Sequence, residues 1–363
     1  MKTGILSFHN TVNYGAELQL FALSRVVSSL GHEVEVINYR NEAIERSSNP
    51  HERETAGLKN LAWRALKYQR AVKKWDAFQQ FQTSYLKMSP EVLPEALLEA
   101  LKRYDSVVVG SDQIWNFDLT HKDPTYFLPF KNPPFRKIAY AASFGKSAIC
   151  AEEEGVVGPW IRDFDHVSMR ETSGADVLSE RFHLQVPSVL DPTMLLGADE
   201  WASLSEDRLL DSPYVAAYGI GPSRKQVFLE SKNIGEALGL PVVWFSSSTY
   251  PLFGVKRMDT IGPQGFLSII ENADYVVTDS FHGTCFSIIF NKRFRTVLES
   301  TASPNNRNSR ICDLLNNLDM SHVCSETIFE GFDWDRVNEK HEKMRAESLR
   351  YLVCALADQG KTE

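Results

Sequence analysis

At the start of the chain, apolar positions change from a continuous run to helical spacing and back, which predicts a β-α-β unit. Residues 2–7 form an apolar run typical of a buried strand, and a polar loop follows it. Apolar residues then recur at helical spacing from Leu18 to Leu30, and Gly31 is placed to end that helix. Residues 33–39 predict a second strand. The polar loop therefore lies at the carboxyl end of a strand in a parallel sheet, where ligands commonly bind.

Residues 41–99 are charged and show helical periodicity. Apolar residues on one face alternate with basic residues, the apolar set being Leu58, Leu61, Ala65, Val72, Trp75 and Phe78 and the basic set Lys59, Arg64, Lys67, Arg70, Lys73 and Lys74. This pattern is typical of a helix with a solvated basic face, which is what we expect here. Because basic amphipathic helices also bind membrane surfaces, a peripheral contact with the inner membrane face stays open as the alternative.

Short apolar runs separated by helical segments continue through the rest of the chain. Strands are expected at residues 104–109, 137–142, 167–169, 188–190, 214–218, 241–245 and 273–278. Helices are expected at residues 225–238 and 263–271, with a long charged helix at 334–356. This alternation is the signature of parallel sheets and assigns the chain to the α/β class.

A chain of 363 residues exceeds the size at which single cores usually stop growing, so we expect two domains with a cleft between them. The pattern divides into an N-terminal Rossmann-like domain over residues 1–195, which includes the helical insertion, and a C-terminal Rossmann-like domain over residues 196–333. Two such units suit an acceptor site on the first and a donor site on the second. The tail, residues 334–363, is expected to pack back on the N-terminal domain.

Composition narrows the class of protein. With 43% hydrophobic and 24% charged residues the chain is typical of folded globular proteins, and a net charge of -8 argues against a protein that coats nucleic acid. The five cysteines contain no CxxC pair, so neither a disulfide framework nor a zinc site is indicated. In the absence of a signal sequence or an apolar stretch long enough for a membrane span, we expect a cytoplasmic location.

The sharpest chemical signal is the segment 275–289, where a buried strand turns abruptly into an apolar helix. Ser280, His282 and Thr284 lie where a helix amino terminus exposes backbone N–H groups. Because Gly283 permits close approach, the turn suits a phosphate or carboxylate. His282 adds a group that titrates near neutral pH. A capping turn that holds a structural histidine stays open as the alternative.

Two loops in the first domain also follow strand ends. Asp112 and Gln113, with Ser111 beside them, follow the expected strand 104–109, and Asp112 is a candidate general base. Because Asp after Ser is also common helix-cap chemistry, that interpretation stays open. The loop of the first β-α-β unit holds three further candidates for ligand contact, Asn13, Tyr14 and Gly15, of which the glycine would let a ligand lie close.

Three arginines are candidates for holding an anion. Arg170 directly follows the expected strand 167–169, and Arg307 and Arg310 lie in a polar loop. A single exposed arginine is usually only solvated, but positions at strand ends favour a ligand role. The chain has no GxxxxGK[ST] phosphate loop, no GxGxxG fingerprint after the first strand, no GxSxG elbow and no HExxH, which leaves transfer chemistry without a cofactor or metal.

Taken together, a series of short motifs resembles the polysaccharide pyruvyltransferase family. The motifs run in order across most of the chain: Asn13-Tyr14-Gly15-Ala16 with Leu18-Gln19, Val109-Gly110-Ser111-Asp112-Gln113-Ile114-Trp115-Asn116, Ser143-Phe144-Gly145, Ser168-Met169-Arg170-Glu171, Leu190-Asp191-Pro192-Thr193, Asp279-Ser280-Phe281-His282-Gly283-Thr284 and Asn308-Ser309-Arg310-Ile311. The resemblance implies two Rossmann-like domains facing across a cleft, in a glycosyltransferase B-like arrangement. It also implies a ketal-forming transferase that moves the pyruvyl group of phosphoenolpyruvate onto a sugar diol in bacterial exopolysaccharide, capsule or cell-wall glycan assembly.

For this chemistry we assign His282 as the acid-base group and Asp112 as the group that assists a sugar hydroxyl. The expected anion clamps are Arg170, Arg310 and the backbone amides of Gly283 and Thr284. Family members that form ketals often carry Arg-Leu-His-Gly where this chain has Ser280-Phe281-His282-Gly283. Arg310 is therefore the candidate replacement for the arginine that Ser280 displaces.

The expected partners are phosphoenolpyruvate and a sugar acceptor, a lipid-linked oligosaccharide being one form considered. No nucleic acid partner is expected. Two alternatives to the pyruvyltransferase stay open: a sugar-nucleotide-dependent glycosyltransferase of the same fold, and a catalytically silent glycan-binding protein.

Overall fold

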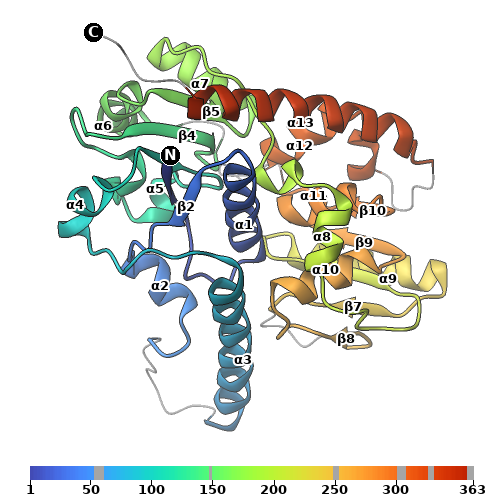
Figure 1. Cartoon of the computed structure of the whole chain (residues 1–363). Helices are drawn as coiled ribbons and strands as arrows, with labels where there is room; N and C mark the ends of the chain where they lie inside the picture. Colours follow the sequence, from blue (N-terminus) through green and yellow to red (C-terminus); the bar gives the residue numbers. More distant parts are fainter. Residues whose placement is uncertain (53–60, 147–148, 248–252, 301–307, 326–330, 358–363) are drawn as a thin grey trace.

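The computed structural model describes residues 1–52, 61–146, 149–247, 253–300, 308–325 and 331–357. These residues form two α/β halves, each built on a five-stranded parallel sheet (Figure 1). The expectation of two parallel-sheet α/β units is confirmed.

The N-terminal half has the strand order β2-β1-β3-β4-β5. Its strands are β1 (Lys2–Leu6), β2 (Glu33–Val36), β3 (Ser106–Val109), β4 (Arg136–Ala142) and β5 (His166–Met169). Its α-helices are α1 (Tyr14–Ser29), α2 (Glu42–Ser48), α3 (Leu61–Tyr85), α4 (Leu97–Leu101), α5 (Phe117–Thr120), α6 (Ala151–Arg162) and α7 (Thr172–Phe182), with 3-10 helices η1 (Pro94–Ala96), η2 (Pro124–Phe127) and η3 (Pro192–Leu195). Every residue of β3 is buried, as a continuous apolar run in the middle of a parallel sheet predicts.

The C-terminal half has the strand order β10-β9-β6-β7-β8. Its strands are β6 (Val215–Tyr218), β7 (Val242–Trp244), β8 (Lys256–Arg257), β9 (Tyr275–Thr278) and β10 (Phe294–Thr296). Its helices are α8 (Ala198–Leu204), α9 (Arg224–Leu238), α10 (Pro263–Glu271), α11 (Phe281–Ile289), α12 (Asn308–Asn317), the 3-10 helix η4 (Ser321–Cys324) and α13 (Trp334–Ala357). Strands β8 and β10 were not predicted, since two or three residues carry too little pattern to be recognised.

Two expectations about local structure were wrong. Residues 188–190 form no strand, and only Ser188 makes a single bridge to Met169, because Pro192 opens the 3-10 helix η3 directly afterwards. The insertion 41–99 is not helical throughout. Its residues after α3 run alongside β2, with bridges from Met88 to Val36 and from Val92 to Tyr39.

Helix α13 lies along both halves of the molecule (Figure 1). On the N-terminal half, Nη2 of Arg136 donates to the carbonyl of Leu356 at 2.8 Å, and the backbone N of Leu190 donates to Oγ of Ser348 at 3.0 Å. At its other end, Lys340 pairs with Asp319 at 2.6 Å. The helix therefore connects the two sheets on the side opposite α3.

Lys74 of α3 does not belong to a solvated basic face. It is 6% exposed, and its Nζ lies 4.4 Å from the ring centroid of Tyr14. Lys74 shares one helical face with Phe78 and Phe81, which are 0% and 1% exposed, because residues four and seven positions apart point the same way. Burial lowers the pKa of Lys74 to about 8, while the charge of Asp259 raises it.

We expect Lys74→Met to raise the free energy of unfolding at pH 7 by about 1 to 3 kcal/mol, since the substitution removes a desolvated ammonium and loses one cation–π contact. With a folded pKa of about 8 and an ordinary value of 10.5, the wild-type chain gains stability as pH rises through that window. The difference in the free energy of unfolding between Lys74→Met and the wild type should therefore shrink between pH 8 and pH 10.5. Urea unfolding across this range measures it. Lys73→Met, at an exposed neighbour, is the matched control and should show no such change.

Candidate functional site

Residues that follow β3 and β9 line a cavity of 80 Å³ between the two halves, which we call the histidine cavity. Asn13 before α1, Ile220 after β6, Glu299 after β10 and residues of α12 complete its walls. Six of the site residues expected from the sequence line it: Asn13, Asp112, Gln113, Ser280, His282 and Arg310. The loops after the strands of both sheets thus meet in one place, as the β-α-β pattern predicts.

Helix α11 begins at the turn that the sequence singled out, but its first hydrogen bonds differ from those expected. Ser280 is the N-cap, and its Oγ accepts from the backbone N of Gly283 at 3.3 Å. The N of Thr284 donates to the carbonyl of Ser280 at 3.0 Å. The expectation that the amides of Gly283 and Thr284 hold a ligand is therefore wrong, because the cap already uses both.

Glycine at position 283 is explained by the packing of the helix start, which the sequence did not reveal. A Cβ at this position would lie 2.4 Å from Oγ1 of Thr278, so the glycine makes room for the end of β9 and not for a ligand. Within the described residues, no acceptor takes the backbone N–H of Phe281 or His282. These two amides are the open donors of the helix terminus.

His282 lies between the two halves. The residue is 7% exposed, and its Nε2 lies 3.6 Å from Oδ2 of Asp191. This nitrogen has no hydrogen-bond partner within the described part of the chain. On the other side of the ring, a Cβ at Gly15 would lie 2.0 Å from Nδ1. The expectation that Gly15 admits a ligand is therefore wrong, because the imidazole of His282 occupies that space.

We expect Gly15→Ala to displace the imidazole and to reduce turnover strongly, with a loss of about 1 to 3 kcal/mol of stability from overpacking. Turnover and urea unfolding measure the two effects. Gly155→Ala, in α6, is the control, because a Cβ there meets no atom within 4 Å and alanine favours the helix. Full activity of Gly15→Ala would show that the position of the imidazole does not matter.

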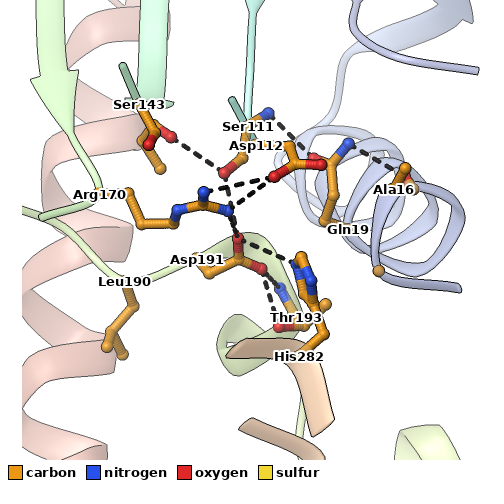
Figure 2. A network of polar contacts seen from close by, with 12 residues as sticks. Ala16, Gln19, Ser111, Asp112, Ser143, Arg170, Leu190, Asp191, Thr193 and His282 are labelled. Atoms are coloured by element: carbon orange, nitrogen blue, oxygen red, sulfur yellow. Dashed lines mark hydrogen bonds and ion pairs between the residues drawn. The ribbon is translucent and has the colours of Figure 1, made fainter. Parts of the chain in front are cut away.

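Asp191 links the residues of the site, a role that the sequence analysis did not assign (Figure 2). Its Oδ2 accepts from Nη1 of Arg170 at 3.0 Å and from Oγ of Ser111 at 3.2 Å. Its Oδ1 accepts from the N and Oγ1 of Thr193 at 3.0 and 2.8 Å. Although burial raises the pKa of Asp191, the charges of His282 and Arg170 hold it below its usual range. The carboxylate therefore stays ionised at neutral pH.

The guanidinium of Arg170 binds carboxylates and not an open anion site. Its side chain is 1% exposed, and both terminal nitrogens lie 3.3 Å from Oδ1 of Asp112, in addition to the contact with Asp191 (Figure 2). The expected grip on a ligand anion is thus not seen at these nitrogens. Arg170 instead holds Asp112 and Asp191 together where the strands end.

Glu171 adds a buried carboxylate that the sequence analysis quoted without a role. It is 1% exposed, and its Oε1 accepts from Oγ of Ser143 at 2.6 Å. Burial raises the pKa of Glu171, while the charges of Arg170 and Arg310 lower it. Oε2 of Glu171, like Nε of Arg170, has no hydrogen-bond partner among the described residues. Unsatisfied buried polar atoms gathered in one network are typical of functional sites.

Two further candidates do not reach the histidine cavity. Ser111 is 0% exposed, and its Oγ donates to the carbonyl of Ala141 at 3.0 Å as well as to Asp191. Tyr14 is 1% exposed, its ring stacks on Phe266 at 4.6 Å, and its hydroxyl donates to a backbone carbonyl of the C-terminal half. Their contact with substrate stays a prediction, while in the structure Ser111 positions Asp191 and Tyr14 joins the cores of the two halves.

Asn13 caps α1, with Oδ1 accepting from the N of Gly15 at 3.0 Å, and it still lines the cavity.

Arg310 enters from α12, and its Cζ lies 5.8 Å from the ring centroid of Phe281. Cζ of Arg170 lies 4.8 Å from the same ring. Arg310 thus brings a cation to the turn at Ser280. The other candidate of that loop, Arg307, lies outside the described residues.

Residues 13–300 match the family model of polysaccharide pyruvyl transferases. The chain belongs to this family. The resemblance drawn from the motifs is confirmed, and because the family consists of transferases the chain is an enzyme. No curated protein sequence matches it. The matched range includes Asp112, Arg170 and His282.

Solved structures share the architecture of this pyruvyl transferase family member. S. aureus MnaA in complex with UDP aligns with a TM-score of 0.50 at 12% identity, covering 98% of this chain and 91% of that one. A candidate UDP-N-acetylglucosamine 2-epimerase from Listeria monocytogenes aligns with a TM-score of 0.51 at 10% identity, covering 95% and 90%. At such identities the likeness concerns the fold alone. It confirms the expected glycosyltransferase B-like arrangement of two parallel-sheet α/β halves.

The described residues contain no group of three His, Cys, Asp or Glu side chains that could hold a metal ion. None of the helices in this part of the chain combines the length and the apolar character that a membrane span needs. All five cysteines are free, and Cys285 of α11 is buried beside the site. Burial raises the pKa of the Cys285 thiol, so the group stays protonated at neutral pH.

Proposed function

We propose that this enzyme transfers the pyruvyl group of phosphoenolpyruvate to two hydroxyls of one sugar, forming a cyclic ketal in the assembly of a bacterial polysaccharide. Family membership supports pyruvyl transfer. The single observation that carries the proposal is the unsatisfied Nε2 of His282, which is buried beside Asp191 in a cavity between the two halves. An acid-base group, a cation and open helix amides meet there.

The chemistry requires one proton donor and one proton acceptor. A proton added to C3 of phosphoenolpyruvate converts its methylene to a methyl group and makes C2 electrophilic. The first sugar hydroxyl then bonds to C2, the C2–O bond to phosphate breaks, and the second hydroxyl bonds to C2 and closes the ring. Of the two hydroxyl protons, one replaces the proton given to C3 and the other leaves with phosphate. General acid-base groups therefore act at both ends of the reaction.

The acid-base roles follow from the hydrogen-bonding state of each group. His282 gives the proton to C3 from Nε2, with the ionised Asp191 3.6 Å away to stabilise positive charge on the ring. Asp112 lines the same cavity and accepts the proton of the attacking hydroxyl. Arg170 is a positioning residue, since it holds both carboxylates in place.

Anion binding falls to groups at the start of α11. The N–H groups of Phe281 and His282 point out of the helix terminus, where a phosphate or carboxylate is favoured. Arg310 supplies the fixed positive charge. The carboxylate of Asp279 lines the cavity too, but its oxygens accept from the backbone N of Ile220 and Gly221 at 2.8 and 3.0 Å. Its charge is thus turned toward the chain's own amides.

We place the donor at the start of α11, in the C-terminal half, and the reacting hydroxyls of the acceptor at Asp112, in the N-terminal half. The acceptor is a sugar of a growing glycan, polymeric or lipid-linked, and a lipid-linked acceptor would bring the enzyme to the inner face of the membrane. The histidine cavity has contributions from both halves, which supports a reaction between two separately bound substrates.

The test is incubation of the full chain with phosphoenolpyruvate and a panel of galactose, glucose, mannose and N-acetylmannosamine glycosides. We expect phosphate release coupled to a pyruvylated product detected by mass. Calorimetry with phosphoenolpyruvate alone provides a readout that does not depend on the acceptor, and we expect heat of binding at millimolar donor. Absence of that heat, or release of a nucleoside diphosphate from UDP-sugars instead of phosphate, would contradict the proposal.

A further inference from the structure

A second cavity, of 410 Å³, lies on the other side of Phe281, and we call it the α13 cavity. Its walls come from the segment around Asp191, from the start of α11, and from α12 and α13. Phe281 and Arg310 line both cavities, so the two share one wall. Its volume lies in the range typical of small-molecule sites.

The α13 cavity has a buried floor and an exposed rim. Leu190, Phe281 and Ser348 on the floor are 4%, 7% and 2% exposed. Asn317 of α12 and Lys343 of α13 on the rim are exposed. A molecule can therefore enter between the two helices and reach the ring that borders the histidine cavity.

The charges at the floor are paired, and Lys340 at the rim pairs with Asp319 at 2.6 Å, whereas two other rim charges have no ion-pair partner among the described residues. Arg170 and Asp191 bind each other at 3.0 Å. Within the described residues, Lys343 and Glu347 have no ion-pair partner, although they lie one helical turn apart on α13. Unpaired charges at a cavity mouth are available to a ligand at no cost in broken ion pairs.

The lining offers three kinds of contact in one space. Leu314 and Met344 provide apolar surface for the face of a sugar ring. Asn317 and Glu347 provide oxygen acceptors for sugar hydroxyls. Lys343 at the rim provides a donor for an anion.

We infer that the α13 cavity binds a phosphate-bearing hexose, as the phosphorylated end of the acceptor, across Phe281 from the donor. The assignment to the acceptor rests on the proposed function, whereas the binding of a hexose phosphate does not. The same chemistry belongs to free hexose phosphates and to sugars joined to a lipid through phosphate.

Calorimetry of the full chain tests the inference with the 1-phosphates of galactose, glucose, mannose and N-acetylglucosamine as probes. We expect at least one to bind, with an affinity that falls as salt rises. Lys343→Ala should weaken binding about tenfold, because it removes one charge-assisted contact. Met344→Trp should abolish binding by filling the cavity. Lys225→Ala, at an exposed lysine of α9, is the matched control and should change nothing.

Comparison probes separate the sources of binding. Uncharged hexoses and inorganic phosphate should each bind more weakly than the best hexose 1-phosphate, and a lipid-linked form should compete with it. Equal binding of inorganic phosphate, binding by none of the four probes, or an unchanged affinity in Lys343→Ala would overturn the inference. Since Lys343 is exposed, a folding defect cannot account for the result in that variant.

The affinity for phosphoenolpyruvate distinguishes this inference from the proposed function. We expect it to be unchanged in Lys343→Ala and Met344→Trp, because the donor lies on the other side of Phe281. Its loss in Met344→Trp would make the α13 cavity the donor site and overturn the assignment to the acceptor. A further outcome is that hexose phosphate binding depends on Lys343 while the enzyme does not turn over phosphoenolpyruvate. That result would support the α13 cavity as a hexose phosphate site and contradict only the proposed function.

Discussion

We expect His282→Ala to lower kcat for phosphate release from phosphoenolpyruvate by about 10²- to 10⁴-fold, the range typical of lost acid-base catalysis. The physical reason is that His282 lines the cavity and its buried Nε2 has no hydrogen-bond partner among the described residues, with the ionised Asp191 3.6 Å away. The measurement is phosphate release at saturating donor and acceptor. Thermal unfolding of the same sample shows that the chain remains folded.

Two further variants test whether the loss of activity is specific to the titratable ring of His282. His121→Asn changes an exposed histidine that does not line the cavity, at a left-handed position that asparagine accepts, and should retain full activity. His282→Gln keeps polar character without a titratable ring and should be as impaired as the alanine variant. Wild-type turnover in His282→Ala would remove the histidine from the mechanism.

Arg170→Met is expected to produce the largest loss of stability, about 3 to 5 kcal/mol in the free energy of unfolding. Arg170 is 1% exposed in its side chain, and its removal leaves Asp112 and Asp191 as buried carboxylates without their shared cation. Because the pKa of Asp191 is held low in the folded chain, its ionised form stabilises the fold at neutral pH, and this stabilisation is lost only in strong acid. Urea unfolding at pH 7 measures the loss.

Two further variants distinguish the removal of the shared cation from a general packing defect as the cause of the lost stability. Combining Arg170→Met with Asp112→Asn removes one of the two stranded charges and should recover part of the stability. Arg350→Met, at an exposed arginine of α13, should change stability by no more than about 0.5 kcal/mol. An Arg170→Met protein as stable as the wild type would show that the two carboxylates do not need their cation.

The parts of the site that the sequence predicts are those set by local pattern. The buried run of β3 places Asp112 at a strand end, and the turn from β9 into α11 places His282 at a helix start. Parallel strands end at one edge of each sheet, so these residues could be expected at the carboxyl edges of the two sheets, on either side of the expected cleft. The predicted reaction came from the family resemblance, because the spacing of residues alone does not identify a reaction.

The parts that the sequence did not predict depend on contacts between distant segments. Gly15 looks like a glycine for ligand approach, yet the ring that fills its space belongs to His282, in the other half. Asp191 stands in a segment without strand pattern, and its contacts with Arg170 and His282 arise only on folding. Lys74 has helical spacing consistent with a buried face, but its charge favoured a solvated interpretation.

The most direct test of the central claim is a crystal structure of the full chain with phosphoenolpyruvate and without acceptor. We expect the donor in the histidine cavity, with anionic oxygens within hydrogen-bond distance of Arg310 and of the backbone N of Phe281 or His282, and with C3 next to Nε2 of His282. Density for phosphoenolpyruvate only in the α13 cavity, or away from His282 altogether, would contradict it.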